Sequence, residues 1–205
     1  MERLRPHDLL RLIDPAELHC EGSVPAWIPA ALARAPWVVV RRARAPSDLI
    51  PVGARGRTRA ERLAAFLVST AVTDRVTPED LATARGWRHT PRVRTIGALR
   101  VLDAADELFA SQGLAWGPTG SVGFELATGV ATVDPASDLD VVIRAPELWP
   151  LDRARTLVDS LARLPVRVDA QLETSLGAVS LTEYARGGTV LLRTPDGPRL
   201  IRHPW

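Results

Sequence analysis

The sequence predicts a mixed α/β protein in two parts, and three observations support this fold class. Segments with helical spacing alternate with short apolar runs from residue 96 to the end of the chain. A polar, proline-containing stretch from Trp87 to Arg94 separates this region from the preceding one. The chain has 205 residues, 46% of them hydrophobic and 24% charged, which is enough for one large or two small domains. We therefore expect one domain at residues 1–88 and a second at residues 92–205.

Proline and glycine residues divide the first part into short elements. The run Trp37–Arg41 predicts a buried strand, because β-branched residues follow one another there. Thr77 and Pro78 predict a helix start, with the threonine as N-cap and the proline in the first helical position. The other predicted elements of this part are an extended segment at Asp48–Gly56 and helices at Asp8–Ile13, Ala26–Arg34 and Arg57–Val72.

The second part begins with the longest predicted helix, Ile96–Gln112, which is amphipathic and is terminated by Gly113. The segment Val166–Leu172 alternates between apolar and polar residues, as a strand with one buried face does. The other predicted strands are Leu114–Gly117, Leu139–Ile143 and Thr189–Arg193, and the other predicted helices are Ser121–Thr128, Leu151–Leu164 and Val179–Arg186.

The composition excludes several classes of protein and of site. No run of about 18 apolar residues occurs, and the N-terminus lacks the apolar segment of a signal peptide, so we expect a cytoplasmic protein without a membrane partner. The single Cys20 rules out an internal disulfide and a cysteine-based metal site. All 26 basic side chains are arginine, which raises the sequence pI to about 9.4. The net charge of +2 nevertheless argues against a nucleic-acid-binding protein.

The segment Trp116–Arg144 carries the strongest functional signal. Gly120 and Ser121 lie at the start of a predicted helix, where exposed N–H groups bind phosphate and glycine permits close approach. Asp138 and Asp140 lie two residues apart at the start of a predicted strand, so both carboxylates should point to one face and can share a divalent cation such as Mg²⁺. Each motif alone also has a purely structural explanation. Ser121 can be a helix N-cap and Gly120 a turn residue, and an Asp-x-Asp pair commonly lies in a solvated loop or a cap. Their order along the chain favours a site for a metal-bound triphosphate.

Asp169 lies in the next predicted strand, between apolar residues. A charge in such a strand is costly unless it is paired or bound to a metal. If the two strands lie side by side, Asp169 completes a three-carboxylate cluster with Asp138 and Asp140.

These residues resemble the nucleotidyltransferase superfamily related to DNA polymerase beta, which has a Gly-Ser pair on a helix, Asp-x-Asp on a strand and a third Asp on a neighbouring strand. Over nearly the whole chain, the sequence also resembles one family, the malonate decarboxylase holo-acyl-carrier-protein synthases, also called phosphoribosyl-dephospho-CoA transferases. The segments that carry this resemblance are HDLL (His7–Leu10), VGARGRTRAER (Val52–Arg62), WGPTGSVGFELATG, SDLDVVIR, VDAQLET, EYARGG, LLRT and the terminal HPW.

The resemblance implies a small N-terminal α/β domain followed by a nucleotidyltransferase-like domain with a mixed sheet flanked by helices. It implies transfer of phosphoribosyl-dephospho-CoA from 2′-(5″-triphosphoribosyl)-3′-dephospho-CoA to a serine of the apo acyl carrier protein of malonate decarboxylase, with release of pyrophosphate. Asp138, Asp140 and Asp169 would be the catalytic residues and the ligands of two Mg²⁺ ions, with Asp169 acting as a ligand or as a general base. Gly120 and Ser121 would hold the leaving pyrophosphate. The nucleophile would belong to the carrier protein.

Arginines of the first part are candidates for the contacts with donor or carrier. Arg55 and Arg57 lie in a turn bracketed by glycine and are the predicted phosphate contacts, and a basic surface would also attract an acidic carrier protein. A solvated face is the alternative for any single arginine.

Two other functions are compatible with the sequence. One is a nucleotidyltransferase of the same superfamily that modifies an antibiotic or another protein, and the other is a catalytically silent binding module that keeps the fold. The three aspartates favour an enzyme, because a silent module has no need to collect carboxylates.

Overall fold

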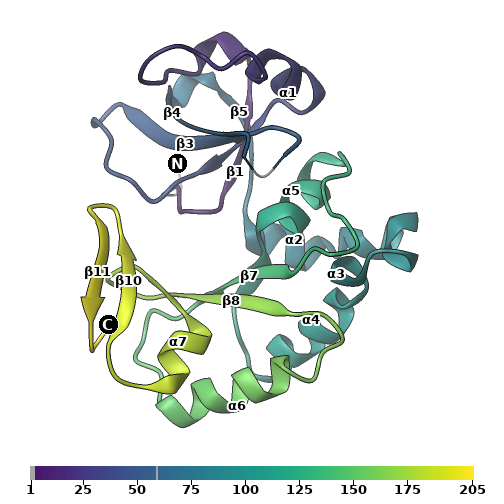
Figure 1. Ribbon diagram of the computed structural model, residues 1–205, viewed down its shortest axis with the longest axis vertical. Coiled ribbons are helices and arrows are strands. Elements are labelled where there is room, and N and C mark those ends of the chain that lie inside the picture. Colours follow the sequence, from purple (N-terminus) through teal and green to yellow (C-terminus); the bar gives the residue numbers. More distant parts are fainter. Residues whose placement is uncertain (1–2, 59) are drawn as a thin grey trace. The chain divides into compact units, whose positions relative to one another are not determined.

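The computed structural model describes residues 3–58 and 60–205, which form two compact units. The first unit comprises the chain up to Thr77 together with Ala127–Val130, and the second comprises Pro78–Leu126 and Ala131–Trp205. Each unit has its own sheet, so the fold class is α+β, in agreement with the prediction (Figure 1). In the described part of the chain, no helix combines the length and the apolar character needed to cross a bilayer.

The boundary between the units falls at Thr77–Pro78, earlier than the limits of 1–88 and 92–205 expected from the sequence. The segment after Pro78 belongs to the second unit because it packs there. Helix α2 (Pro78–Ala84) lies so close to Gly117 that a Cβ on this glycine would be 2.0 Å from the carbonyl oxygen of Pro78. Trp87 is fully buried. The stretch expected to be a linker forms two 3₁₀ helices, Gly86–His89 and Pro91–Arg94.

The first unit is built on a five-stranded antiparallel sheet in the order β4-β3-β2-β1-β5. Helix α1 (Ile28–Arg34) buries Ile28 and Leu32 in the core of this unit. The strands are β1 (Leu9–Leu12), β2 (Trp37–Val40), β3 (Leu49–Arg55), β4 (Arg62–Val68) and β5 (Val72–Val76), and short 3₁₀ helices occupy Pro15–Glu17 and Ser69–Ala71. The predictions at Ala26–Arg34, Trp37–Arg41 and Asp48–Gly56 are confirmed.

Two helices predicted in this unit are wrong. Asp8–Ile13 contains strand β1, which pairs with β2 and β5, and Arg57–Val72 contains strand β4, which pairs with β3 along its whole length. In β4, Ala65 and Leu67 are fully buried and alternate with more exposed neighbours, which is the period of a strand. Short apolar runs fit both periods, and pairing with neighbouring strands decides between them.

The second unit contains a six-stranded sheet in the order β11-β10-β9-β8-β7-β6. Only β7 and β8 pair in parallel among these described strands, so the sheet is mixed, as predicted. The strands are β6 (Trp116–Pro118), β7 (Leu139–Arg144), β8 (Val168–Glu173), β9 (Ala178–Ser180), β10 (Val190–Thr194) and β11 (Gly197–Ile201). The helices after α2 are α3 (Gly97–Arg100), α4 (Leu102–Ser111), α5 (Gly120–Thr128), α6 (Leu151–Leu161) and α7 (Leu181–Arg186).

Most elements of this unit follow the sequence prediction, with three differences. The predicted helix Ile96–Gln112 is divided at Val101 into α3 and α4. The predicted helix Val179–Arg186 begins with the short strand β9, since Ala178–Ser180 pairs with the end of β8. Strand β11 was not expected, because Gly197–Ile201 has no strong β pattern of its own and is held by its pairing with β10.

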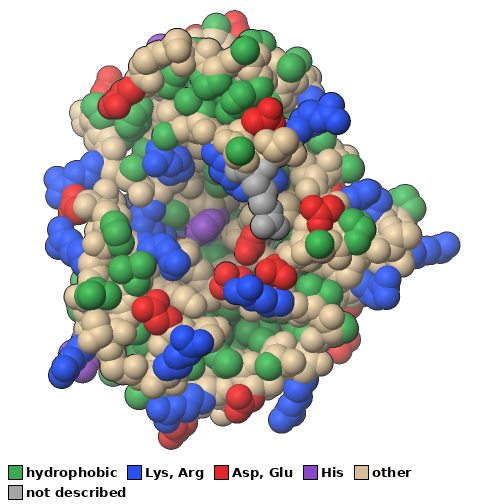
Figure 2. All heavy atoms as spheres, in the orientation of Figure 1, with side chains coloured by type: hydrophobic (Ala, Val, Ile, Leu, Met, Phe, Trp, Pro, Cys, Tyr) green, Lys and Arg blue, Asp and Glu red, His purple; other side chains and the backbone are tan. Residues whose placement is uncertain are grey.

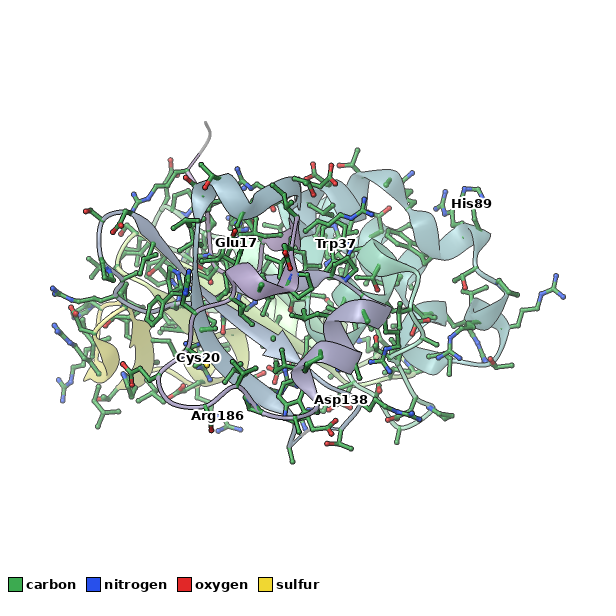
Figure 3. The ribbon with its side chains drawn as sticks, turned by 90° about the horizontal axis from the view of Figure 1, so that it is seen from above. Glu17, Cys20, Trp37, His89, Asp138 and Arg186 are labelled. Atoms are coloured by element: carbon green, nitrogen blue, oxygen red, sulfur yellow. The ribbon has the colours of Figure 1, made fainter. Side chains whose placement is uncertain are left out.

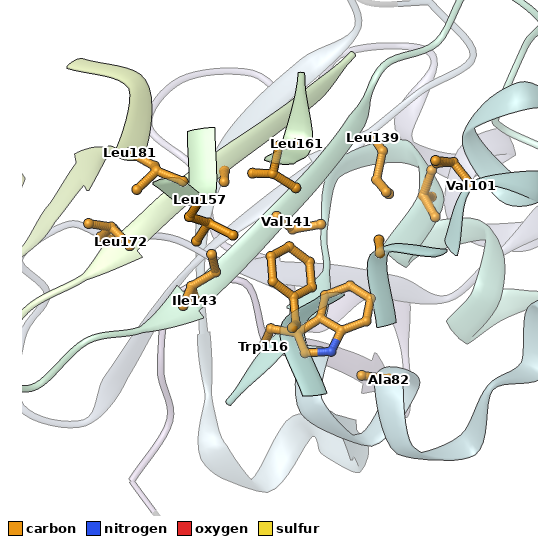
Figure 4. Close-up of a cluster of buried hydrophobic side chains, with 14 of the residues drawn as sticks. Ala82, Val101, Trp116, Leu139, Val141, Ile143, Leu157, Leu161, Leu172 and Leu181 are labelled. Atoms are coloured by element: carbon orange, nitrogen blue, oxygen red, sulfur yellow. The ribbon is translucent and has the colours of Figure 1, made fainter. Parts of the chain in front are cut away.

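One face of the second sheet is apolar and forms the core. Leu139, Val141 and Ile143 of β7 pack with Leu157 and Leu161 of α6 in this core (Figure 4). Helices α6 and α7 lie on the same side of β7 and β8 (Figure 1). Because successive residues of a strand point to opposite faces, the intervening polar residues of β7 and β8 lie on the other face. This second face carries the predicted site.

Candidate active site

Gly120, the first residue of α5, lies close to the side chain of Asp140 in β7. The Thr119 N–H donates to the Asp140 carbonyl oxygen at 2.8 Å, and the Thr119 carbonyl accepts from the Gly123 N–H at 2.8 Å. Thr119 therefore joins the end of β6 to the start of α5. A Cβ on Gly120 would lie 2.1 Å from Asp140 Oδ2, and Gly120 has a φ of +59°. The Asp140 carboxylate thus lies against the N-terminus of α5, where N–H groups favour anions.

Asp140 and Asp169 are register partners in the parallel pair of β7 and β8. Neighbouring strands are about 4.8 Å apart and paired residues point to the same face, so the two carboxylates are neighbours. Among the described residues, the Asp169 side chain forms no hydrogen bond or ion pair, and Asp169 is exposed. Like charges placed opposite each other destabilise a sheet, and a bound cation would remove this repulsion.

Asp138 lies immediately before β7 rather than within it. Its Oδ2 is 3.6 Å from Arg167 Nη1, and the two side chains are 46% and 73% exposed, so this is a weak surface ion pair. The next residue is fixed, because the Leu139 N–H donates to the Arg167 carbonyl oxygen at 2.9 Å. Figure 3 shows Asp138 far from His89, an exposed residue at the edge of the same unit. His89 therefore does not contribute to the carboxylate site.

The donor set fits a hard divalent cation, because it consists of carboxylate oxygens on adjacent strands. Within residues 3–58 and 60–205, no three His, Cys, Asp or Glu side chains are gathered closely enough to enclose a metal ion. Mg²⁺ is commonly held by one or two carboxylates together with phosphate oxygens of a substrate. Asp140 and Asp169 provide such a pair, and Asp138 lies at the start of the same strand.

Ser121 lies in the first turn of α5 and is half-buried. Because α5 begins at Gly120, Ser121 lies within the helix and not at the residue before it. The Ser121 carbonyl oxygen accepts from Thr132 Oγ1 at 3.0 Å, while its own hydroxyl makes no hydrogen bond to the described residues. The Ser121 hydroxyl therefore lies at the N-terminus of α5, together with Gly120 and the first backbone N–H groups of the helix.

The predicted arginine contacts belong to the first unit, and the aspartates, Gly120 and Ser121 to the second. Arg55 ends β3, opposite Arg62 of β4. Arg57 is exposed in the turn after β3, and its backbone N–H donates to Glu61 Oε2 at 2.7 Å. Hydrogen bonds from the backbone N–H groups of Thr58 and Arg57 lower the pKa of the Glu61 carboxyl. Arginine and carboxylate side chains are interspersed on the face shown in Figure 2.

Sequence inspection missed four charged residues around the site. Arg92 pairs with Glu125 of α5, and Arg144 of β7 forms a two-bonded ion pair with Glu79 of α2. The position of Glu125 on the buried side of α5 could have indicated its importance, because a buried carboxylate needs hydrogen-bonding or charged partners. The partners themselves are distant in sequence and could not be identified from it.

Known proteins are similar in sequence to this chain over both units. The family model described as the phosphoribosyl-dephospho-CoA transferase MdcG C-terminal domain matches residues 86–204, and the model described as the N-terminal domain matches residues 5–78. The chain is 42% identical over 202 residues to a phosphoribosyl-dephospho-CoA transferase of Pseudomonas aeruginosa, which covers 98% of this chain and 93% of that protein.

Two further relatives are also phosphoribosyl-dephospho-CoA transferases. One, of Pseudomonas putida, is 41% identical over 206 residues, covering 100% of this chain and 97% of the relative. The other, of Azotobacter vinelandii, is 42% identical over 205 residues, covering 98% and 94%. No solved structure matches the chain.

Proposed function

This chain belongs to the phosphoribosyl-dephospho-CoA transferase family, and we propose that its donor is 2′-(5″-triphosphoribosyl)-3′-dephospho-CoA and its acceptor a serine of the apo acyl carrier protein of malonate decarboxylase. The products are the phosphodiester-linked carrier protein and pyrophosphate. Membership of the family supports the identity of the transferred group. The residues of the second unit support the type of reaction that transfers it.

The observation that carries the proposal is the placement of Asp140 between Gly120 and Asp169. The N-terminus of α5 offers N–H groups for phosphate oxygens, and the two carboxylates offer a place for the cation that accompanies a triphosphate. Such a combination suits displacement at a phosphorus atom with pyrophosphate as the leaving group. It has no evident use in a module that only binds a neutral ligand.

In the proposed reaction, the Oγ atom of the carrier serine forms a bond to the phosphorus attached to the ribose. The bond from this phosphorus to the bridging oxygen of the pyrophosphate breaks, and pyrophosphate leaves with that bonding pair. The backbone N–H groups at the start of α5 and the hydroxyl of Ser121 bind the departing pyrophosphate oxygens. The serine proton passes to Asp169 if this residue is free to act as a base, or to water if Asp169 is a ligand.

We propose that Asp138, Asp140 and Asp169 hold two Mg²⁺ ions during this reaction. When bound, such ions neutralise the phosphate charge and stabilise the attacking and leaving oxygens. The carboxylates fit this role because their own repulsion is relieved by the cations. The protein contributes the placement of these carboxylates through the pairing of β7 with β8.

The acceptor supplies the nucleophile, so the serines of this chain need not react. We propose that Arg55 and Arg57 contact phosphates of the donor or the acidic surface of the carrier protein, in a cytoplasmic setting. Arginine suits this role because its guanidinium group donates two parallel hydrogen bonds to a phosphate.

The proposal is tested by incubating the full chain with Mg²⁺, the triphosphoribosyl donor and the apo carrier protein, and then measuring the mass of the carrier. We expect the carrier to gain one phosphoribosyl-dephospho-CoA unit, with pyrophosphate released in equal amount, and neither product with Asp140→Asn. A gain with ATP but not with this donor would indicate a different nucleotidyltransferase. No gain with any donor from a folded protein would indicate a binding module.

A further inference from the structure

Glu125 is a buried carboxylate close to the site that the proposed reaction does not use. It lies on α5, one helical turn after Ser121, and is 6% exposed. Its Oε1 accepts from Arg92 Nε at 2.8 Å, and its Oε2 accepts from the backbone N–H groups of Thr132 at 2.7 Å and Val133 at 2.9 Å. Both carboxylate oxygens therefore hold groups that are distant from Glu125 in sequence.

Arg92 contacts both Glu125 and the loop that Glu125 holds. Its Nη2 donates to the Val133 carbonyl oxygen, so one guanidinium group contacts both the carboxylate and the loop that the carboxylate holds. Arg92 belongs to the 3₁₀ helix Pro91–Arg94, and its carbonyl oxygen accepts from the N–H groups of Thr95 and Ile96, both at 3.0 Å. The arginine is thus anchored on regular structure outside the loop.

The chain that Glu125 holds leads directly to Asp138. Asp134 and Ser137 close a turn, since the Asp134 N–H donates to Ser137 Oγ at 3.0 Å and the Ser137 N–H donates to the Asp134 carbonyl at 3.1 Å. The Ala136 N–H donates to Asp134 Oδ1 at 2.9 Å within this turn. With Leu139 fixed by β8, the backbone is fastened on both sides of Asp138.

In this ion pair Glu125 is buried and the Arg92 side chain is 36% exposed, and pairing a buried carboxylate in this way is seldom an efficient way to stabilise a fold. Removing a carboxylate from water is costly, and apolar residues of similar size often stabilise a protein equally well or better. What the pair provides is a defined backbone geometry, because Glu125 and Arg92 together engage three polar atoms of Thr132 and Val133. The neighbouring Thr132 Oγ1 also ties the loop to the Ser121 carbonyl at 3.0 Å.

We infer that Glu125, held by Arg92, is a positioning residue that fixes the loop Thr132–Asp138 and thereby sets the Asp138 carboxylate for cation binding beside Asp140. This inference rests on the proposed function, since it takes Asp138 as a cation ligand. Loss of such outer partners commonly weakens metal binding about 10- to 100-fold.

The test compares Mn²⁺ binding, measured by electron paramagnetic resonance, in the full-length wild-type protein and in Glu125→Gln. A glutamine has the same shape, but its NH₂ group must face either Arg92 or the two backbone donors, so one side of the arrangement is lost. Arg92→Lys is a second variant, because a lysine cannot donate from two nitrogens in a fixed fork. The matched control is Asp106→Asn, whose carboxylate is 9% exposed and pairs with Arg85 at 2.6 Å elsewhere in the same unit.

We expect the Mn²⁺ dissociation constant to rise about tenfold or more in Glu125→Gln and in Arg92→Lys, and to be unchanged in Asp106→Asn. Amide hydrogen exchange at Thr132 and Val133 should accelerate in the first two variants only. In the transfer assay, the half-saturating Mg²⁺ concentration should rise while kcat at saturating Mg²⁺ recovers.

Wild-type Mn²⁺ affinity in both Glu125→Gln and Arg92→Lys would overturn the inference. Faster loop exchange with unchanged affinity would also overturn it, because Glu125 would then stabilise the loop without positioning Asp138. Failure of the proposed metal site is distinguishable, since the wild-type protein itself would bind Mn²⁺ no better than Asp138→Asn. The inference would fall together with that site.

Discussion

Gly120 and Asp140 fit together so closely that a side chain on the first would overlap the second. A Cβ at Gly120 would lie 2.1 Å from Oδ2 and 2.9 Å from Cγ of Asp140. The φ of +59° at Gly120 disfavours any residue with a Cβ for an independent reason. The glycine of the Gly-Ser pair is therefore required by the backbone and by the carboxylate on the neighbouring strand.

Gly120→Ala is expected to lower the rate of transfer about 100-fold while leaving a folded protein. The new methyl group must displace the Asp140 carboxylate, and a displacement of about 1 Å in a reacting site can cost about 100-fold in rate. The positive φ adds about 1–2 kcal/mol of strain. Steady-state kinetics and thermal unfolding, measured together, separate the two effects.

Gly113→Ala provides a matched control for this variant. Gly113 has a φ of +63°, but a Cβ there would meet nothing within 4 Å. We expect the same loss of stability as in Gly120→Ala with near-normal turnover. Equal loss of activity in the two variants would show that backbone strain, and not contact with Asp140, explains the effect.

Asp169→Asn is expected to have opposite effects on stability without and with Mg²⁺. In the metal-free protein, removing one of two opposed charges should stabilise the second unit by about 0.2–1 kcal/mol. Addition of Mg²⁺ should raise the Tm of the wild-type protein and leave the variant nearly unchanged, because ligand binding to the folded state is lost. Differential scanning fluorimetry across a Mg²⁺ series measures both. A variant that keeps the full Mg²⁺ response would exclude Asp169 as a ligand.

Asp103 is expected to make the stability of the second unit depend on pH. The indole N–H of buried Trp87 donates to Asp103 Oδ1 at 2.9 Å, and this bond, together with the one from Arg88 Nε at 2.7 Å, lowers the pKa of the carboxyl below its ordinary value of 3.8. A lowered pKa stabilises the fold above pH 3.8, and this contribution is lost as the pH falls through the folded-state pKa. Urea unfolding should show a higher free energy of unfolding for wild type than for Asp103→Asn at pH 7, and no difference at a pH below the folded-state pKa of Asp103.

Asp103→Ala should be more damaging than Asp103→Asn at neutral pH. The alanine leaves the Trp87 N–H without an acceptor in the core, which costs about 1–3 kcal/mol, whereas asparagine keeps an acceptor oxygen. Tryptophan fluorescence follows the unfolding of both variants. If the two variants prove equally stable, the indole hydrogen bond contributes nothing measurable.

Arg57→Ala is expected to raise KM for the donor or the carrier protein without a change in kcat. Arg57 is exposed in the turn after β3, where its backbone, not its guanidinium group, is bonded to Glu61. The turn should therefore keep its shape in the variant. Arg11→Ala is the control, since Arg11 is also exposed and pairs with Asp74 at 3.5 Å. If Arg57→Ala, Arg11→Ala and wild type have equal kinetics, Arg57 is a solvated surface residue without a role in binding donor or carrier.

Local sequence signals predicted the elements whose residues have one strong preference. The β-branched run of β2 and the Thr77-Pro78 start of α2 are of this kind. The segments that became β1 and β4 are short and fit a helical as well as an alternating pattern. Their conformation depends on pairing with β2, β3 and β5, which are distant in sequence, so local periodicity could not decide it.

The sequence by itself determined the chemistry available to the site: a glycine and a serine at one helix start, two aspartates at the start of one strand and a third in another. Only the tertiary structure decided that Asp140 faces both Gly120 and Asp169, because this depends on the register of β7 with β6 and β8. It also joined Glu125 to Arg92. Residue types are a local property of the chain, whereas contacts between strands and loops arise only when the whole core is packed.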